Sequence, residues 1–473
     1  MSVKRLIAPS ERESVTSQAA LNTPKSRSRN LLDMAMLFVG KTGAILVGIF
    51  FLPIYHTQLG NDAFGVVAII LSIQAFALMA DFGMVTLVGR DVASQEPHSV
   101  EGFVVWRQAE AMLCAAYGVI LVFTLIACAL TRSSLDQAQM YTLCVVFFLL
   151  IVLQNLAQTP LLAQKHFALA STIQVCGVTF RAGATALALV ATQGGVFVFL
   201  WVQLISTALH LIITRHFCRS LLLERTSSEA AALTWGNIWR LLRRGSPIFL
   251  SGLAGAAVMQ LDKPLLSAFV PLGDISPYFL AMSAAVLPTA LLAAPLVQYF
   301  QPQIIKTIAL PRNENSDQIV ARFTFALILV VAVPSWILWQ WADPIIRLWL
   351  RDPGQAALVA GYLRILLPGF ALGGLCYVPV VLLLAVQDFK YQALTSVAMT
   401  VGTLALVVTF AFLRRVDLVC YSYIAYFVSA SISVWWRSFK LPTTRQIAKV
   451  SASKSLLPLS ALALAATTIS FQF

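Results

Sequence analysis

The sequence predicts an all-α polytopic membrane protein with about twelve core transmembrane helices, arranged as two six-helix lobes. Of its 473 residues, 59% are hydrophobic and 11% are charged, whereas soluble proteins average about 25% charged residues. The apolar residues come in long runs, each long enough to cross a bilayer as a helix. The longest polar stretches, residues 1–30 and about 216–245, are too short for a folded domain.

Twelve apolar runs are expected to span the membrane. They cover residues 31–55, 63–83, 108–130, 138–158, 167–191, 195–214, 246–269, 276–299, 319–341, 357–386, 391–413 and 417–436. A short apolar stretch, 455–471, contains Pro458 and is consistent with either a thirteenth span or an interfacial tail.

The polar stretches divide the chain into five expected parts. Residues 1–30 form a basic, disordered cytoplasmic tail, and residues 31–215 form the first six-helix lobe. The linker 216–245 contains a basic amphipathic segment, which is either a helix on the inner leaflet or a solvated linker helix. Residues 246–437 form the second lobe, and 438–473 hold a basic segment with the short apolar stretch.

The distribution of Lys and Arg predicts the orientation. With the N-terminus in the cytoplasm, 24 of these residues fall in cytoplasmic segments and 5 in outer loops. Basic residues concentrate in cytoplasmic loops, so both termini of the twelve-span core are expected inside. The net charge of +13 is therefore attributed to topology, and no nucleic-acid partner is expected.

A faint internal repeat supports the division into two lobes. The turn after the first span reads LGNDAFG, Leu59–Gly65, and the turn after the seventh reads LGDISPYF, Leu272–Phe279. Both turns occupy the first outer hairpin of a six-span half. Repeats related by an axis along the membrane normal are common in membrane carriers.

The sequence shows no pattern typical of an enzyme. The seven cysteines and five histidines are scattered, and there is no CxxC pair, phosphate-binding loop, HExxH or GxSxG motif. We therefore expect no catalytic residues, no metal and no cofactor.

Four basic residues fall inside the predicted spans, where topology does not explain them. They are Lys41, Arg181, Lys263 and Arg364. A charge inside a bilayer costs about 3 to more than 10 kcal/mol unless a cavity or a partner solvates it. Arginine can bind a phosphate through two parallel hydrogen bonds, and lysine acts as a point charge. These residues are therefore candidates for binding an anionic head group.

Three acidic residues, Asp33, Asp81 and Asp262, offer the alternative that the bases are simply neutralised. Asp33 precedes Lys41 by about two helical turns, whereas neighbours such as Asp262 and Lys263 point about 100° apart on a helix. Each acid is a candidate ion or proton coupling site, or a charge partner. Arg364 could also extend to the outer interface. Because bases outnumber acids, we expect an anionic cargo.

Two stretches resemble bacterial polysaccharide flippases of the Wzx type, which carry lipid-linked oligosaccharides such as O-antigen units. They are Leu59–Ala93, LGNDAFGVVAIILSIQAFALMADFGMVTLVGRDVA, and Leu261–Ala281, LDKPLLSAFVPLGDISPYFLA; Gly194–Gln203 and Pro344–Pro353 are weaker matches. The resemblance implies the multidrug/oligosaccharidyl-lipid/polysaccharide (MOP) exporter superfamily, which also holds MATE drug exporters and the lipid II flippase. It also implies that the two six-helix lobes surround a central cavity.

The resemblance further implies that undecaprenyl-pyrophosphate-linked oligosaccharide moves from the cytoplasmic to the periplasmic leaflet of the bacterial inner membrane by alternating access. The implied partners are this lipid-linked oligosaccharide, membrane lipids, and a polysaccharide polymerase and glycosyltransferases. Lys41, Arg181 and Lys263 are the positions implied to contact the cargo, while no motif surrounds Arg364. A MATE-like ion-coupled antiporter and a non-transporting scaffold of a polysaccharide assembly complex are the alternatives.

Overall fold

The computed structural model describes residues 27–93, 100–223, 253–308 and 314–453. These residues form helices joined by short turns and contain no β-strand. Ten of the described helices are long and apolar enough to cross a membrane. A helix satisfies its own backbone hydrogen bonds, which the hydrocarbon core of a bilayer cannot do. The predicted all-α membrane fold is confirmed.

The first lobe begins with α2, Arg27–Met79, a kinked helix that contains the first predicted span and most of the second. Residues 80–83, the end of the predicted span 63–83, form the turn after α2. The kink lies at Gly60, whose φ of 74° and ψ of 174° are accessible to glycine and costly for other residues. The other helices of this lobe are α3 (Met84–Ala93), α4 (Val100–Leu130), α5 (Leu135–Ala163), α6 (Phe167–Thr192) and α7 (Val196–Leu223).

The second lobe opens on a broken span. Residues 253–260 are helical, the chain bends at Leu261, and the short helix α9 covers Asp262–Leu266. The predicted span 246–269 is therefore interrupted over its described part. The remaining helices are α10 (Leu272–Ala285), η1 (Pro288–Ala293), α11 (Ala294–Ile308), α12 (Glu314–Leu327), η2 (Ile328–Ala332), α13 (Val333–Gln340), α14 (Ala342–Leu350), α15 (Pro353–Leu375), α16 (Tyr377–Ala385), α17 (Phe389–Phe412), α18 (Val416–Lys440) and α19 (Pro442–Ser451).

The two π-helical turns, η1 and η2, lie beside prolines and pack against each other. Pro288 begins η1, and Pro334 stands at the start of α13, directly after η2. Proline has no backbone N–H and crowds the preceding turn, so it disturbs the α-helical hydrogen bonds nearby.

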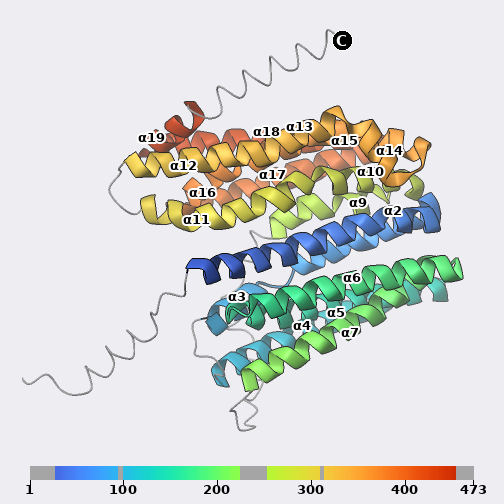
Figure 1. The fold of residues 1–473 in the computed structure, drawn as a ribbon. Helices are drawn as coiled ribbons and strands as arrows, with labels where there is room; N and C mark the ends of the chain where they lie inside the picture. Colours follow the sequence, from blue (N-terminus) through green and yellow to red (C-terminus); the bar gives the residue numbers. More distant parts are fainter. Residues whose placement is uncertain (1–26, 94–99, 224–252, 309–313, 454–473) are drawn as a thin grey trace, which may run out of the picture.

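Figure 1 shows the two lobes side by side, α2–α7 in blue to green and α9–α19 in yellow to red. Helix α2 lies at the boundary and packs against α6 of its own lobe and α10 of the other. Helix α7 continues to Leu223, inside the predicted linker 216–245. The rest of that linker, its expected amphipathic helix and the stretch 455–471 lie outside the described residues.

The two turns of the predicted repeat meet each other across the lobe boundary. A Cβ atom added at Gly65 would lie 2.0 Å from the backbone oxygen of Leu272. The rings of Phe64 and Phe279 pack edge to face with their centroids 6.0 Å apart. We call this end of the molecule, which also carries α14, the Gly60 end; α3 and α19 lie at the opposite end (Figure 1). The lobes are in tight contact at the Gly60 end.

Candidate functional site: buried cations in the two lobes

Lys263 lies in the second lobe beside a buried acid. Lys263 is 3% exposed and Asp262 is 0% exposed, and Lys263 Nζ lies 2.9 Å from Asp262 Oδ1. The ammonium group also donates a hydrogen bond of 2.9 Å to the backbone oxygen of Met259, one turn earlier. The flexible lysine stem folds back along the chain, which overcomes the divergence of adjacent side chains on a helix. Lys263 therefore has a counter-charge in this conformation.

Two tyrosines enclose this ion pair. Tyr278 of α10 donates its hydroxyl hydrogen to Asp262 Oδ2, and its ring centroid lies 5.8 Å from Lys263 Nζ. Tyr423 of α18 donates a hydrogen bond of 2.7 Å to the backbone oxygen of Val258. Both tyrosines are fully buried. Buried charges are tolerated when paired and hydrogen-bonded. Here the two charges are paired, and Lys263 Nζ and Asp262 Oδ2 are hydrogen-bonded, whereas Asp262 Oδ1 makes no hydrogen bond among the described residues.

Arg181 lies in the first lobe, on α6, where its hydrogen-bond partner is a neutral side chain. Arg181 Nη1 donates a hydrogen bond of 3.3 Å to Thr207 Oγ1 on α7. Beside it on α6, the backbone oxygen of Ala182 accepts a hydrogen bond of 3.0 Å from the Tyr55 hydroxyl. Among the residues that the structure describes, no carboxylate lies within ion-pair distance of Arg181. Its positive charge is thus solvated only by neutral groups within that part of the chain.

A line of polar side chains continues from Arg181 through the first lobe. Gln154 on α5 donates a hydrogen bond of 3.2 Å to Gln174 on α6, and its amide nitrogen lies 3.4 Å from His210 Nε2 on α7. Gln203 donates a hydrogen bond of 3.3 Å to Thr185. Helix α7 repeats polar residues at helical spacing. They are Gln203, Ser206, Thr207, His210 and Thr214, and all are buried.

The other predicted residues lie apart from these two clusters. Lys41 and Asp33 belong to α2, but their side chains are outside the described part of the structure. Arg364 on α15 pairs with Asp343, with 2.6 Å between Nη2 and Oδ2, and both side chains are exposed. The structure therefore places Arg364 near the Gly60 end in a surface ion pair.

Asp81 lies in the turn between α2 and α3 and is buried. Its two carboxylate oxygens accept hydrogen bonds from the backbone N–H groups of Gly83, at 2.9 Å, and Val85, at 3.0 Å. Burial raises the pKa of Asp81, and these two N–H groups oppose that shift. The contacts are those of a residue that caps a helix N-terminus.

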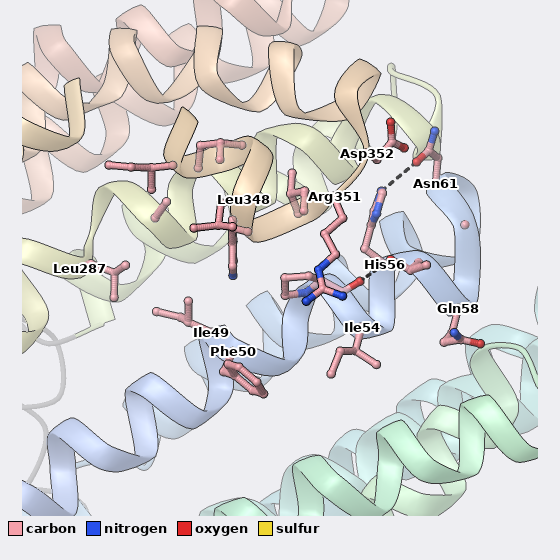
Figure 2. Close-up of a pocket in the computed structure, with 18 of the residues that line it drawn as sticks. Ile49, Phe50, Ile54, His56, Gln58, Asn61, Leu287, Leu348, Arg351 and Asp352 are labelled. Atoms are coloured by element: carbon pink, nitrogen blue, oxygen red, sulfur yellow. Dashed lines mark hydrogen bonds between the residues drawn. The ribbon is translucent and has the colours of Figure 1, made fainter. Parts of the chain in front are cut away.

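A pocket of about 950 Å³ opens between the lobes at the Gly60 end (Figure 2). Its walls come from the second half of the first span, including Ile49 and Phe50, and from α10 and α13–α14. The walls are mainly apolar; the polar residues His56, Asn61 and Asp352 lie at one end, and the Arg351 side chain extends from that end towards Ile54. Sequence reasoning did not single out this pocket, because its two sides, residues 49–61 and 284–352, are far apart in the chain.

Comparison with known proteins decides the family. The family described as "Polysaccharide biosynthesis protein" matches residues 31–308. The chain belongs to this family. A search of curated proteins finds no significant match.

Solved structures with the same fold come from the MOP superfamily. Lipid II flippase MurJ in an inward closed conformation is 13% identical, with 92% of this chain and 93% of that chain covered and a TM-score of 0.66. An inward-facing MATE family multidrug resistance transporter is 13% identical, with 86% and 95% covered and a TM-score of 0.63. The MATE multidrug transporter DinF-BH is 13% identical, with 89% and 97% covered and a TM-score of 0.62.

Membership in this polysaccharide biosynthesis family confirms the resemblance drawn from Leu59–Ala93 and Leu261–Ala281, both of which lie within the matched residues. The family and the fold are those of multi-pass membrane transporters and flippases. Within that fold, Lys263 and Arg181 lie in different lobes and have different electrostatic surroundings.

Proposed function

We propose that this protein is a flippase that moves undecaprenyl-pyrophosphate-linked oligosaccharide from the cytoplasmic to the periplasmic leaflet of the bacterial inner membrane. Its polysaccharide biosynthesis family and its likeness in fold to a lipid II flippase support this assignment. The choice of an anionic cargo rests on the surroundings of Arg181. This residue lies in a predicted membrane span and donates a hydrogen bond to a neutral hydroxyl, with no acid within ion-pair distance among the described residues.

The cost of the Arg181 charge supports a role in binding. Solvation by one hydroxyl leaves most of the guanidinium hydrogen-bonding capacity unused, because the group carries five N–H donors. A pyrophosphate would accept several of these donors at once and supply the missing negative charge. Lys41, on the same lobe, is the second proposed contact, and Arg364 is a weaker one because Asp343 already neutralises it.

Lys263 is proposed to bind the cargo only in part of the cycle. In the described conformation its charge is shared with Asp262, so an incoming anion would have to compete with a buried carboxylate. Protonation of Asp262 would remove that competitor and free the ammonium group. This gives Asp262 the clearest coupling role of the three acids. Asp33 remains a second candidate, and the Asp81 carboxylate is engaged by two backbone N–H groups.

Alternating access would require the two lobes to separate at the Gly60 end. There, Gly65 approaches Leu272 too closely for any side chain, so the lobes touch at these two turns, beside the pocket that opens next to α14. With the predicted cytoplasmic N-terminus, the Gly60 end faces the periplasm, and the contact between the two turns is the one that would have to break on that side. The sugars would then enter from the cytoplasm, where glycosyltransferases assemble them, and leave towards a polymerase.

The test is transport by the purified protein in proteoliposomes. Fluorescent undecaprenyl-pyrophosphate-linked oligosaccharide should become accessible to a reagent on the opposite leaflet faster than in protein-free vesicles. A MATE-like antiporter would instead move a cationic dye against an ion gradient and leave the lipid-linked sugar in place. A scaffold would move neither compound, and either result would contradict the proposal.

A further inference from the structure

The pocket at the Gly60 end has the two-part character of a lipid site. Ile49, Phe50 and Leu287 form its apolar end, His56 and Asn61 lie at the other, and the Arg351 side chain extends between the two ends towards Ile54 (Figure 2). From Ile49 to His56 the helix rises by about 10 Å. The pocket therefore changes from apolar to polar over about the distance that separates a phospholipid head group from the upper part of its chains.

The apolar end of the pocket has exposed margins. Phe50 is 68% exposed and Leu348 is 81% exposed, although both are large apolar side chains. In a membrane protein such residues are stable where they meet hydrocarbon. Trp349 of α14 also lines the pocket, and tryptophan is enriched at the level of lipid head groups. The apolar end of the pocket thus suits a lipid acyl chain, and the polar end suits a lipid head group.

The polar end carries one charge of each sign. Arg351 and Asp352 are consecutive and form the loop between α14 and α15. Among the described residues, Arg351 forms no ion pair or side-chain hydrogen bond. Asp352 caps α15 through Oδ1, which accepts hydrogen bonds from Gly354 at 3.0 Å and Gln355 at 3.3 Å. Its Oδ2 takes part in neither bond.

We propose that this pocket binds a phospholipid with a zwitterionic head group that carries a primary ammonium. Arg351 would bind the phosphate, Asp352 Oδ2 would accept from the ammonium group, and the acyl chains would run past Phe50 and Leu348. An anionic lipid satisfies only Arg351 and meets repulsion from Asp352. With the predicted orientation, the lipid belongs to the outer leaflet and fills the seam between the lobes while the Gly60 end is closed.

Native mass spectrometry of the full-length chain, delipidated in detergent, tests this site. Phosphatidylethanolamine should bind in preference to phosphatidylglycerol and phosphatidylcholine, whose head groups lack the primary ammonium. Arg351→Gln and Asp352→Asn should each weaken phosphatidylethanolamine binding about fivefold, the size expected for one exposed charge interaction. Asparagine still caps a helix, so the second variant keeps α15 intact.

Arg347→Gln is the matched control, because Arg347 is exposed on α14 but does not line the pocket. It should leave lipid binding unchanged. Equal binding of all three lipids would overturn the zwitterionic site, as would binding that depends on Arg351 and not on Asp352. Undecaprenyl phosphate serves as a further probe: if it displaces phosphatidylethanolamine and binds more tightly, the pocket belongs to the cargo instead. None of these measurements depends on transport activity.

Discussion

Arg181 and Lys263 are both basic residues of predicted membrane spans, one in each lobe, and they differ in the groups that surround their charges. Lys263 contacts Asp262 at 2.9 Å and is enclosed by Tyr278. Arg181 has a threonine hydroxyl at 3.3 Å and, among the described residues, no acid. A buried pair is close to neutral in its surroundings, whereas an unpaired cation attracts any anion that enters. This difference is the basis for proposing Arg181 as a permanent anion site and Lys263 as a conditional one.

The largest effect is expected from breaking the Lys263 pair. Asp262→Asn leaves Lys263 buried without a counter-charge and should cost about 3–5 kcal/mol of stability. Replacing both residues, as Asp262→Asn with Lys263→Met, should recover most of that loss. Thermal unfolding of the detergent-purified variants measures both. If Asp262→Asn alone is as stable as the wild type, Asp262 does not neutralise Lys263.

Arg181→Gln should reduce transport about 10- to 100-fold, which corresponds to one or two hydrogen bonds to a charged group. Its stability should stay near that of the wild type, because no buried acid is left behind among the described residues. Surface polysaccharide output at matched expression is the measurement, with Thr207→Val as the control that keeps the charge. Full output from Arg181→Gln would remove the main support for an anionic cargo.

Asp81 supplies the converse case, a buried acid whose described partners are backbone N–H groups. Asp81→Ala should cost about 1 kcal/mol through loss of the cap on α3, and Asp81→Asn less. Because burial raises the pKa of Asp81, its protonated form stabilises the fold. This contribution to the free energy of unfolding is complete below the ordinary carboxyl pKa of 3.8. It is lost as the pH rises through the raised pKa that Asp81 has in the folded protein. Unfolding measured from about pH 3 upwards should show this slope in the wild type and not in Asp81→Asn.

The smallest effect is expected at Arg364. Its pair with Asp343 is exposed, so Arg364→Gln should change stability by less than about 1 kcal/mol. Transport should fall much less than in Arg181→Gln, which a side-by-side output assay would measure. Equal losses in the two variants would contradict the distinction between a paired and an unpaired base.

Much of the fold follows from residues that are close in the chain. The apolar runs predicted the spans, and the described helices α4, α5, α6, α17 and α18 each contain one. The break at Leu261 was not predicted, because hydropathy averages over a window and is insensitive to a single bend. The π-helical turns were not predicted either, since they depend on how two proline-containing spans pack together.

For the candidate site, the sequence predicted the basic residues but not the residues that contact them. Arg181 and Lys263 could be identified because each is a charged residue in an apolar run. Placing an uncompensated charge in a membrane span costs free energy whichever helix carries it. Their partners were harder to infer. Asp262 was expected to diverge from Lys263, while Tyr278 and Thr207 carry no local signal beyond being polar. The polar stripe on α7 was present in the sequence as a helical spacing, and a search for that period would have found it.

Composition and local pattern were enough to predict a helical membrane protein with basic residues inside its spans, whereas its family was implied by the resemblance of two stretches and shown by the family comparison. They suffice because the bilayer imposes the same demands on every segment. Packing in three dimensions established which base is neutralised, that the two repeated turns meet, and that Arg351 borders a pocket with α2. The contact between the turns and the pocket both depend on separate helices packing together, and the ion pair depends on the Lys263 side chain folding back. The spacing of residues along the chain does not encode either kind of contact.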